Sequence, residues 1–193
     1  AVSGDDGSTI WEWGRLPEGD PADPMARAME AEAQLAAGDI DGDGLAEIIG
    51  VKYTYIAPNE NCEMTDPGCC IRGKFAHGSL YALEHDGTFK WESQLWRMPE
   101  FVIENGGGPA IGDMNGDGWP EIAFGNAVFS HNGQLLFEGT TSTSADGGDG
   151  EGGAGHGPMS VFVDLNGDGT NELVSGRTAF NYAGEKIWHR EDL

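Results

Sequence analysis

The stretch Asp39-Ile40-Asp41-Gly42-Asp43-Gly44-Leu45-Ala46-Glu47 decides how this chain folds, because it occurs three times. The other two copies run from Asp113 to Glu121 and from Asp164 to Glu172. Each copy has an oxygen-bearing side chain at positions 1, 3 and 5, a glycine at position 6 and a glutamate at position 9. Ca²⁺ takes about six to eight oxygen ligands on a flexible loop. The repeat therefore predicts three calcium sites, and solvated Asp-Gly turns are the alternative.

The expected ligands are the side-chain oxygens at positions 1, 3, 5 and 9 and the backbone carbonyl at position 7. They are Asp39, Asp41, Asp43, Leu45 and Glu47 in the first loop, Asp113, Asn115, Asp117, Trp119 and Glu121 in the second, and Asp164, Asn166, Asp168, Thr170 and Glu172 in the third. An EF-hand would need a glutamate at position 12 and flanking helices. Position 12 is Gly50, Phe124 or Ser175, so the loops are not EF-hands.

The composition excludes several classes of partner. The chain has 193 residues and a formal net charge of −23, whereas nucleic acids and anionic membranes are bound by basic patches. No apolar run has the length of a transmembrane helix, so membrane insertion is not expected. The chain begins at Ala1 in sequence typical of a mature protein, with no signal peptide visible. High glycine content and 9% aromatic residues favour a turn-rich all-β protein.

The three cysteines lie close together, at Cys62, Cys69 and Cys70. They have no CxxC spacing and no histidine partner nearby, which argues against zinc. In an oxidising compartment we expect a disulfide from Cys62 to either Cys69 or Cys70, with the remaining cysteine free or bonded outside this chain. Calcium loops of this kind also suit the extracellular space.

A second repeated feature is a glycine turn followed four residues later by a large aromatic residue. The pairs are Gly7 and Trp11, Gly87 and Trp91, Gly133 and Phe137, and Gly184 and Trp188. Asp86-Gly87 and Asn132-Gly133 indicate short hairpins whose two central residues both have positive φ. The pattern predicts hairpins with the aromatic residue on the second strand.

The acidic loops and the hairpins combine into one repeat of four strands. From loop aspartate to hairpin glycine the distance is 20 residues in the second and third copies (113 to 133 and 164 to 184) and 48 in the first (39 to 87). Such a unit is typical of a β-propeller blade. The predicted division is a half blade at 1–16, a blade at 34–93 with a cysteine-containing insertion at about 54–78, a blade at 107–138, a glycine-rich loop at 139–157 and a blade at 158–190.

These repeats resemble the FG-GAP or VCBS family, the calcium-bearing blades of integrin α-subunits and of many bacterial secreted proteins. The resemblance runs from about Gln34 to Trp188 and implies a β-propeller with Ca²⁺ in each acidic loop. The family usually closes its loop with aspartate at position 9, whereas Glu47, Glu121 and Glu172 stand there here. Three blades and a half leave open edges, so we expect either further blades or pairing with another chain.

Two stretches fit the repeat less well. Residues 24–34 are rich in helix formers and predict either a short helix or an extended lead into the first blade. Residues 139–157 contain eight glycines and indicate a flexible surface loop.

The leading functional hypothesis is a non-catalytic, calcium-stabilised segment of a secreted or cell-surface protein that binds or adheres to a protein or glycan. An alternative is a fragment of a polysaccharide lyase, since rhamnogalacturonan lyases are similar in carrying calcium-bearing blades. No catalytic residue is predicted: among His77, His85, His131, His156 and His189, the equivalent positions of His85 and His131 before hairpin turns indicate repeat geometry, and His156 in the glycine-rich loop is the one that could face a ligand. Another alternative is a lectin-like module that stacks sugars on Trp96 or Trp119.

Overall fold

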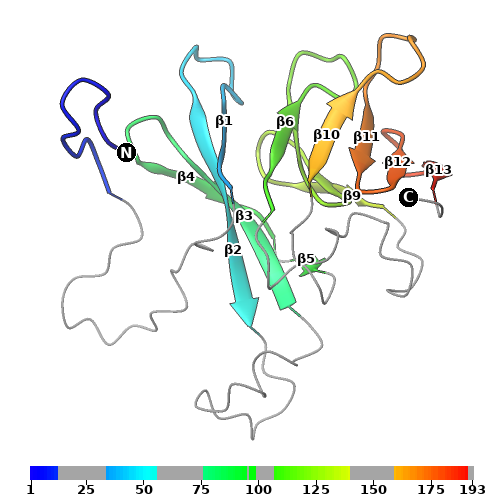
Figure 1. Cartoon of the computed structure of the whole chain (residues 1–193), viewed down its shortest axis with the longest axis horizontal. Coiled ribbons are helices and arrows are strands. Elements are labelled where there is room, and N and C mark those ends of the chain that lie inside the picture. Colours follow the sequence, from blue (N-terminus) through cyan, green and yellow to red (C-terminus); the bar gives the residue numbers. More distant parts are fainter. Residues whose placement is uncertain (13–33, 56–75, 95, 99–106, 140–158, 191–193) are drawn as a thin grey trace, which may run out of the picture.

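The computed structural model describes residues 1–12, 34–55, 76–94, 96–98, 107–139 and 159–190, and this part of the chain is all-β (Figure 1). It forms strands β1 to β13 and no helix. The described residues therefore contain no helix that is long and apolar enough to cross a bilayer. The predicted fold class is confirmed at this level: the strands form three separate antiparallel sheets.

Each sheet is built from four consecutive strands in chain order, and the first sheet gains a fifth strand through β5, which pairs with β3. The first sheet contains β1 (Ala36–Gly38), β2 (Glu47–Tyr55), β3 (Ala76–Leu83), β4 (Phe89–Glu92) and β5 (Trp96–Met98). The second contains β6 (Ala110–Gly112), β7 (Glu121–Phe124), β8 (Ala127–Phe129) and β9 (Leu135–Glu138). The third contains β10 (Ser160–Val163), β11 (Glu172–Ser175), β12 (Thr178–Phe180) and β13 (Lys186–His189).

The first strands of the three sheets lie side by side, with β6 between β1 and β10 (Figure 1). Small residues let them approach: a Cβ added to Gly38 would lie 3.3 Å from Ile111 Cδ1, and one added to Gly112 would lie 2.9 Å from Phe162 Cδ2. Each large residue of one sheet thus packs where the preceding sheet has glycine.

Two apolar cores fill the spaces between neighbouring sheets. Ile40 and Leu80 of the first sheet pack with Ile122 and Phe129 of the second, and Met114 packs with the third sheet in the other core. The second sheet is covered on both faces, so β7 and β8 are buried at every position instead of alternating. The described sheets form an open row that does not close into a ring.

The hairpins differ from the two-residue turns expected from the sequence. Gly87 N–H donates to Glu84 O at 2.9 Å, and Glu84 N–H donates to Thr88 O at 2.8 Å, so three residues form the loop. Of the three loop residues only Gly87 has positive φ, at 85°. In the described ranges no residue other than glycine has positive φ. This is a type I turn closed by a glycine bulge, which explains the register shift at Ala82/Leu83.

Three of the four hairpin aromatics, Trp11, Trp91 and Phe137, pack on the glycine turn of the sheet that follows them. A Cβ on Gly87 would lie 2.6 Å from Trp11 Cδ2, and one on Gly133 would lie 2.7 Å from Trp91 Cε3. Phe137 lies against Gly184 in the same way, at 2.8 Å. The two indoles also donate hydrogen bonds to the backbone, Trp11 Nε1 to His85 O at 3.0 Å and Trp91 Nε1 to His131 O at 3.1 Å. The repeated aromatic therefore joins one sheet to the next.

Several predicted features lie outside the described residues. These are Cys62, Cys69 and Cys70, most of the stretch at 24–34, and the glycine-rich loop apart from Gly139. Strands β2 and β3 extend to Tyr55 and from Ala76, further into the expected insertion at 54–78 than the sequence indicated. The N-terminal residues 1–12 form a turn with a single bridge between Val2 and Thr9.

Candidate metal centre in three acidic loops

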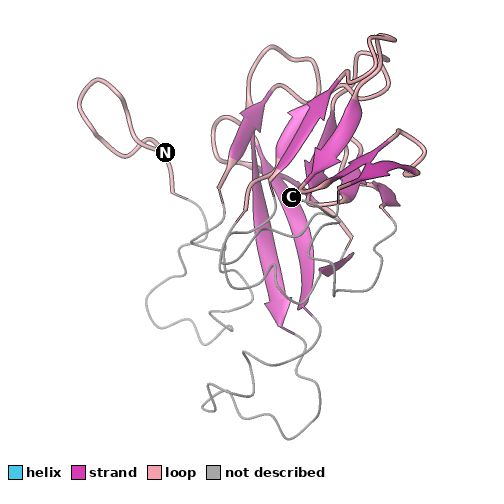
Figure 2. Cartoon of the chain, turned by 45° about the vertical axis from the view of Figure 1, so that its right-hand side comes forward, coloured by secondary structure: helices cyan, strands magenta, loops and turns pink. Residues whose placement is uncertain are grey.

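The three acidic loops occupy the same place in each sheet. They join β1 to β2, β6 to β7 and β10 to β11, and all three lie at one end of the sheets (Figures 1 and 2). The fold thus brings the fifteen predicted ligand residues to one edge of the molecule. Each loop keeps its own group of oxygen-bearing side chains.

The aspartate at position 1 holds each loop by accepting backbone hydrogen bonds. In the first loop, Asp39 Oδ1 accepts from Gly42 N–H at 2.7 Å and Oδ2 accepts from Gly44 N–H at 2.9 Å. Asp113 and Asp164 accept the equivalent bonds at 2.6 to 2.9 Å. The glycines at positions 4 and 6 all have positive φ, as at Gly42 and Gly44 with 80° and 88°. The loop shape therefore follows from residues within the loop itself.

Positions 3 and 5 repeat this arrangement two residues along. Asp43 N–H donates to Asp41 Oδ1 at 3.1 Å, and Leu45 N–H donates to Asp43 Oδ1 at 2.7 Å. In the other loops these bonds lower carboxyl pKa values: the Trp119 N–H lowers the pKa of Asp117, and the Thr170 hydroxyl and N–H lower that of Asp168. Backbone N–H groups thus offset part of the repulsion between the carboxylates of each loop.

The glutamate at position 9 reaches back across each loop to its second residue. Glu47 Oε2 accepts from Ile40 N–H at 2.8 Å, and Glu121 and Glu172 accept from Met114 and Leu165 at 2.7 and 2.8 Å. The longer side chain makes this closure possible. All three glutamates are buried, and burial raises the pKa of Glu47 and of Glu121. The glutamate that is expected to supply a metal ligand therefore also closes the loop through a hydrogen bond to the backbone N–H of position 2.

The first loop gathers the most carboxylate. Oxygens of Asp39, Asp41 and Asp43 lie within 4.8 Å of one another, as do those of Asp41, Glu47 and Glu84. Glu47 is fully buried, and its Oε1 has no hydrogen-bond partner among the described residues. A buried carboxylate oxygen without a partner is costly, so this atom is one that a bound cation could satisfy. The chemistry of this donor set fits Ca²⁺.

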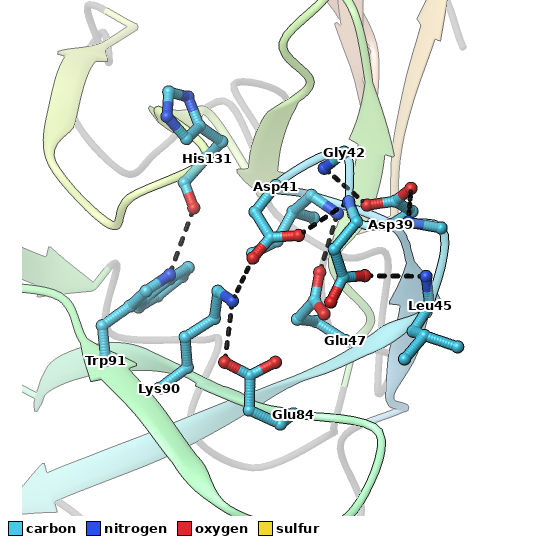
Figure 3. A network of polar contacts seen from close by, with 12 residues as sticks. Asp39, Asp41, Gly42, Leu45, Glu47, Glu84, Lys90, Trp91 and His131 are labelled. Atoms are coloured by element: carbon cyan, nitrogen blue, oxygen red, sulfur yellow. Dashed lines mark hydrogen bonds and ion pairs between the residues drawn. The ribbon is translucent and has the colours of Figure 1, made fainter.

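A lysine from the hairpin lies beside the first loop (Figure 3). Lys90 Nζ is 2.6 Å from Asp41 Oδ2 and 2.8 Å from Glu84 Oε1. Burial disfavours the charged lysine, but its hydrogen bonds to Asp41 and Glu84 outweigh this and raise the pKa of Lys90. The corresponding residues of the other sheets are Leu136 and Ile187. The first loop thus differs from the other two in having the ammonium group of a lysine beside its carboxylates.

Replacing Lys90 by methionine is expected to make the first loop more dependent on calcium. Without the ammonium, the loss of two charge-assisted hydrogen bonds should destabilise the protein in EDTA by about 1–3 kcal/mol. Ca²⁺ should then restore stability, because it no longer competes with Lys90 for Asp41. The measurement is chemical unfolding in EDTA and in Ca²⁺. Lys52→Met is the control, since Lys52 pairs with Glu92 at 3.1 Å, away from the loops. Equal responses of the two variants would contradict this role.

The second and third loops are bonded to each other. Asn171 donates from its backbone N–H to Met114 O at 2.9 Å and from Nδ2 to Asp113 O at 2.6 Å. Sequence reasoning missed Asn171, Lys90 and Glu84 as partners of the loops. Asn171 stands at position 8 of its own loop, and Lys90 and Glu84 flank a turn more than 35 residues beyond the first loop, so no local spacing marked them.

The other candidate residues are scattered. Trp119, 45% exposed, stacks on His131 with ring centroids 4.7 Å apart. His189 Nδ1 lies 2.8 Å from Thr178 Oγ1, and the backbone carbonyls of His85 and His131 accept the tryptophan hydrogen bonds described above. The side chains of His77 and Trp96 and the whole of His156 lie outside the described part of the chain.

Fold and loops together define a class: all-β repeats of four antiparallel strands, each with an acidic loop after its first strand. No protein-family model and no curated protein matches the chain. Among solved structures, it is similar to the V. cholerae biofilm matrix protein Bap1, with 24% identity and a TM-score of 0.51 over 83% of this chain and 20% of that one. This likeness supports the fold.

Weaker matches are the exotype rhamnogalacturonan lyase YesX, with 17% identity and a TM-score of 0.34, and a Bacillus licheniformis rhamnogalacturonan lyase, with 14% identity and a TM-score of 0.28. Both matches cover 81% of this chain, and they cover 40% and 46% of those enzymes. The chain thus spans less than half of each protein that it resembles.

Proposed function

We propose that this chain is a calcium-stabilised, non-catalytic segment of a β-propeller of the FG-GAP or VCBS kind. The observation that carries the proposal is the repetition of one unit: three four-stranded sheets stand in a row, with β1, β6 and β10 adjacent and an acidic loop at the same end of each. Propellers arrange four-stranded blades around a central channel. The open row of sheets would then be part of such a ring.

In this proposal each loop binds one Ca²⁺. The ligands would be the side chains at positions 1, 3 and 5, the carbonyl of Leu45, Trp119 or Thr170, and the Oε1 of the position-9 glutamate. In the third loop, Glu172 Oε1 also accepts from Asn166 Nδ2 at 3.2 Å. The hydrogen bonds within the loop orient these oxygens in advance, so the ion's part is to neutralise them. The buried Glu47 Oε1 supports this reading most directly.

Calcium is expected to raise the stability of the folded chain. A ligand that binds only the folded state contributes about 2.7 kcal/mol per site at a hundredfold excess over its dissociation constant. The measurement is thermal unfolding in EDTA against millimolar Ca²⁺, with bound metal counted by mass spectrometry. Three ions are expected per chain. Mg²⁺ should substitute poorly, because it needs a smaller octahedral shell.

Single substitutions distinguish the sites. Asp43→Ala, Asp117→Ala and Asp168→Ala should each remove one ion, because each deletes the position-5 ligand. Asp5→Ala, in the N-terminal turn, is the control and should leave all three ions. A melting temperature that Ca²⁺ leaves unchanged, together with no bound calcium, would identify the loops as ordinary acidic turns.

We further propose that the segment works outside the cell in binding or adhesion to a protein or glycan. Two observations support this: the solved structure with the higher TM-score is a biofilm matrix protein, and the net charge of −23 suits a soluble, calcium-rich setting. The exposed Trp119 ring, held by His131, is the group that would stack on a sugar. Glycan-array binding that Trp119→Ala abolishes, with calcium content unchanged, would support a glycan ligand; binding unchanged by Trp119→Ala would count against this site.

A further inference from the structure

The hydrogen bonds that join the second and third acidic loops have no counterpart between the first and second loops. They come from Asn171, at position 8 of the third loop. Position 8 is Pro120 in the second loop and Ala46 in the first. Proline has no backbone N–H, and neither of these side chains is a hydrogen-bond donor. Among the described residues, no hydrogen bond joins the second loop to the first.

Asn171 lies between two expected calcium ligands of its own loop. The carbonyl of Thr170 at position 7 and the carboxylate of Glu172 at position 9 flank it along the chain. Glu172 is buried, and its Oε2 accepts from Leu165 N–H at 2.8 Å. Because an ion in the third loop would fix both flanking residues, it would also fix the two donors of Asn171.

The acceptors of these two bonds belong to residues that hold the ligands of the second loop. Asn171 Nδ2 donates to Asp113 O at 2.6 Å, and its backbone N–H donates to Met114 O at 2.9 Å. Asp113 is the expected ligand at position 1, and its carboxylate accepts N–H groups of both loop glycines. Met114 N–H donates to Oε2 of Glu121, the expected ligand at position 9. Asn171 therefore bonds to the residues that orient the first and last ligands of the second loop.

Packing also holds the second and third loops together. Met114 is fully buried in one core with Leu173 and Phe180 of the third sheet. A Cβ added to Gly116 would lie 4.0 Å from Gly169 O, so the two loop backbones run close together. A shift of one loop would thus disturb the other.

We propose that Asn171 couples the second and third calcium sites, so that an ion in either loop increases the affinity of the other loop. This inference rests on the calcium sites proposed above. An ion that orders one loop lowers the cost of ordering the other, because the two loops share these hydrogen bonds. Coupling between binding free energies is reciprocal, so each ion acts on the other by the same factor. The first loop stays outside this pair.

The coupling acts against the charges of the loops. An ion in one loop reduces the negative charge that attracts an ion to the other loop, so electrostatics alone would weaken the second binding step. Salt screens this effect between exposed charges. Stronger binding at the second step would therefore come from the contacts between the loops.

Calcium titration of aspartate variants measures the coupling. All titrations use the full chain with Asp43→Ala, which leaves the second and third sites. Asp117→Ala and Asp168→Ala in this background each leave one site, whose association constant is measured by calorimetry at about 0.15 M salt. The overall association constant for both ions should exceed the product of the two single-site constants by about fivefold or more. A variant loop has a formal charge midway between those of an empty and a filled loop, so the effects of charge cancel in this comparison.

The ratio of the overall constant to this product also separates the coupling from the calcium proposal. A ratio of unity with two bound ions would overturn the coupling and leave the calcium sites in place. A chain that binds no Ca²⁺ would overturn both proposals.

Variants of Asn171 identify the residue responsible. Asn171→Pro gives the third loop the proline that the second loop has at this position and removes both bonds, so it should bring the ratio to unity while two ions still bind. Asn171→Ala keeps the backbone bond and should lower the ratio part of the way. Ala46→Pro, the same change in the first loop, is the control and should leave the ratio unchanged. Circular dichroism like that of the wild type shows that each variant folds. A ratio that neither Asn171→Pro nor Asn171→Ala changes would overturn the role of Asn171.

Discussion

Replacing Gly50 by alanine is expected to prevent the first sheet from folding. Gly50 lies in β2 opposite Tyr81 in β3, and the tyrosine ring crosses the glycine. An added Cβ would lie 1.9 Å from Tyr81 Oη and 2.2 Å from Cζ, distances that no packed structure tolerates. Tyr81 is 1% exposed, so displacing its ring would disturb the buried residues around it. We expect a loss of at least about 3 kcal/mol, at the upper end of overpacking effects.

Urea unfolding followed by circular dichroism measures this loss. Gly4→Ala is the matched control, because a Cβ there meets no atom within 4 Å. The control should unfold at the wild-type midpoint, whereas Gly50→Ala should unfold at much lower urea or be unfolded in buffer. A Gly50→Ala chain with the wild-type midpoint would show that Tyr81 does not lie across β2.

The second large effect is expected at the joint between the first and second sheets. Gly133 has φ of 80°, where alanine costs about 1–2 kcal/mol. Its added Cβ would also lie 2.7 Å from Trp91 Cε3, and displacing the indole costs about a further 1–3 kcal/mol. Gly133→Ala should therefore lower the free energy of unfolding by about 2–5 kcal/mol.

A double-mutant cycle with Trp91→Ala separates the two contributions. In the Trp91→Ala background the clash is absent, so Gly133→Ala should cost only the backbone strain of about 1–2 kcal/mol. The measurement is urea unfolding of the four chains. Equal costs of Gly133→Ala in both backgrounds would contradict the packing of Trp91 on this turn.

The all-β class and the division into repeated units could be predicted from the sequence because short motifs mark each loop and turn. Alternating strand-forming runs, loop aspartates and turn glycines recur at equal spacing, and the strands follow them. The predicted two-residue turns were wrong, because Asp86-Gly87 and Asn132-Gly133 also suit a three-residue loop with a glycine bulge. That choice depends on the register of the flanking strands, which two residues do not specify.

The loops show the same division. Their conformation could be predicted because each contact joins residues at most eight positions apart, with aspartate oxygens accepting backbone N–H groups and glycines at positive φ. Binding of calcium by these loops remains a prediction. The lysine beside the first loop could not be predicted, since Lys90 and Asp41 are 49 residues apart and meet only through the pairing of β2, β3 and β4.

By itself the sequence determined the short-range structure: which residues turn, which extend, and where oxygen-bearing side chains gather. These depend on backbone preferences and hydrogen bonds within about ten residues. Only the tertiary structure decided which neighbour each sheet has, because that depends on the sizes of side chains from separate repeats. Glycine opposite Phe162 and glycine beneath Trp91 make the joints between neighbouring sheets, and these pairs come from residues about 50 and 42 positions apart.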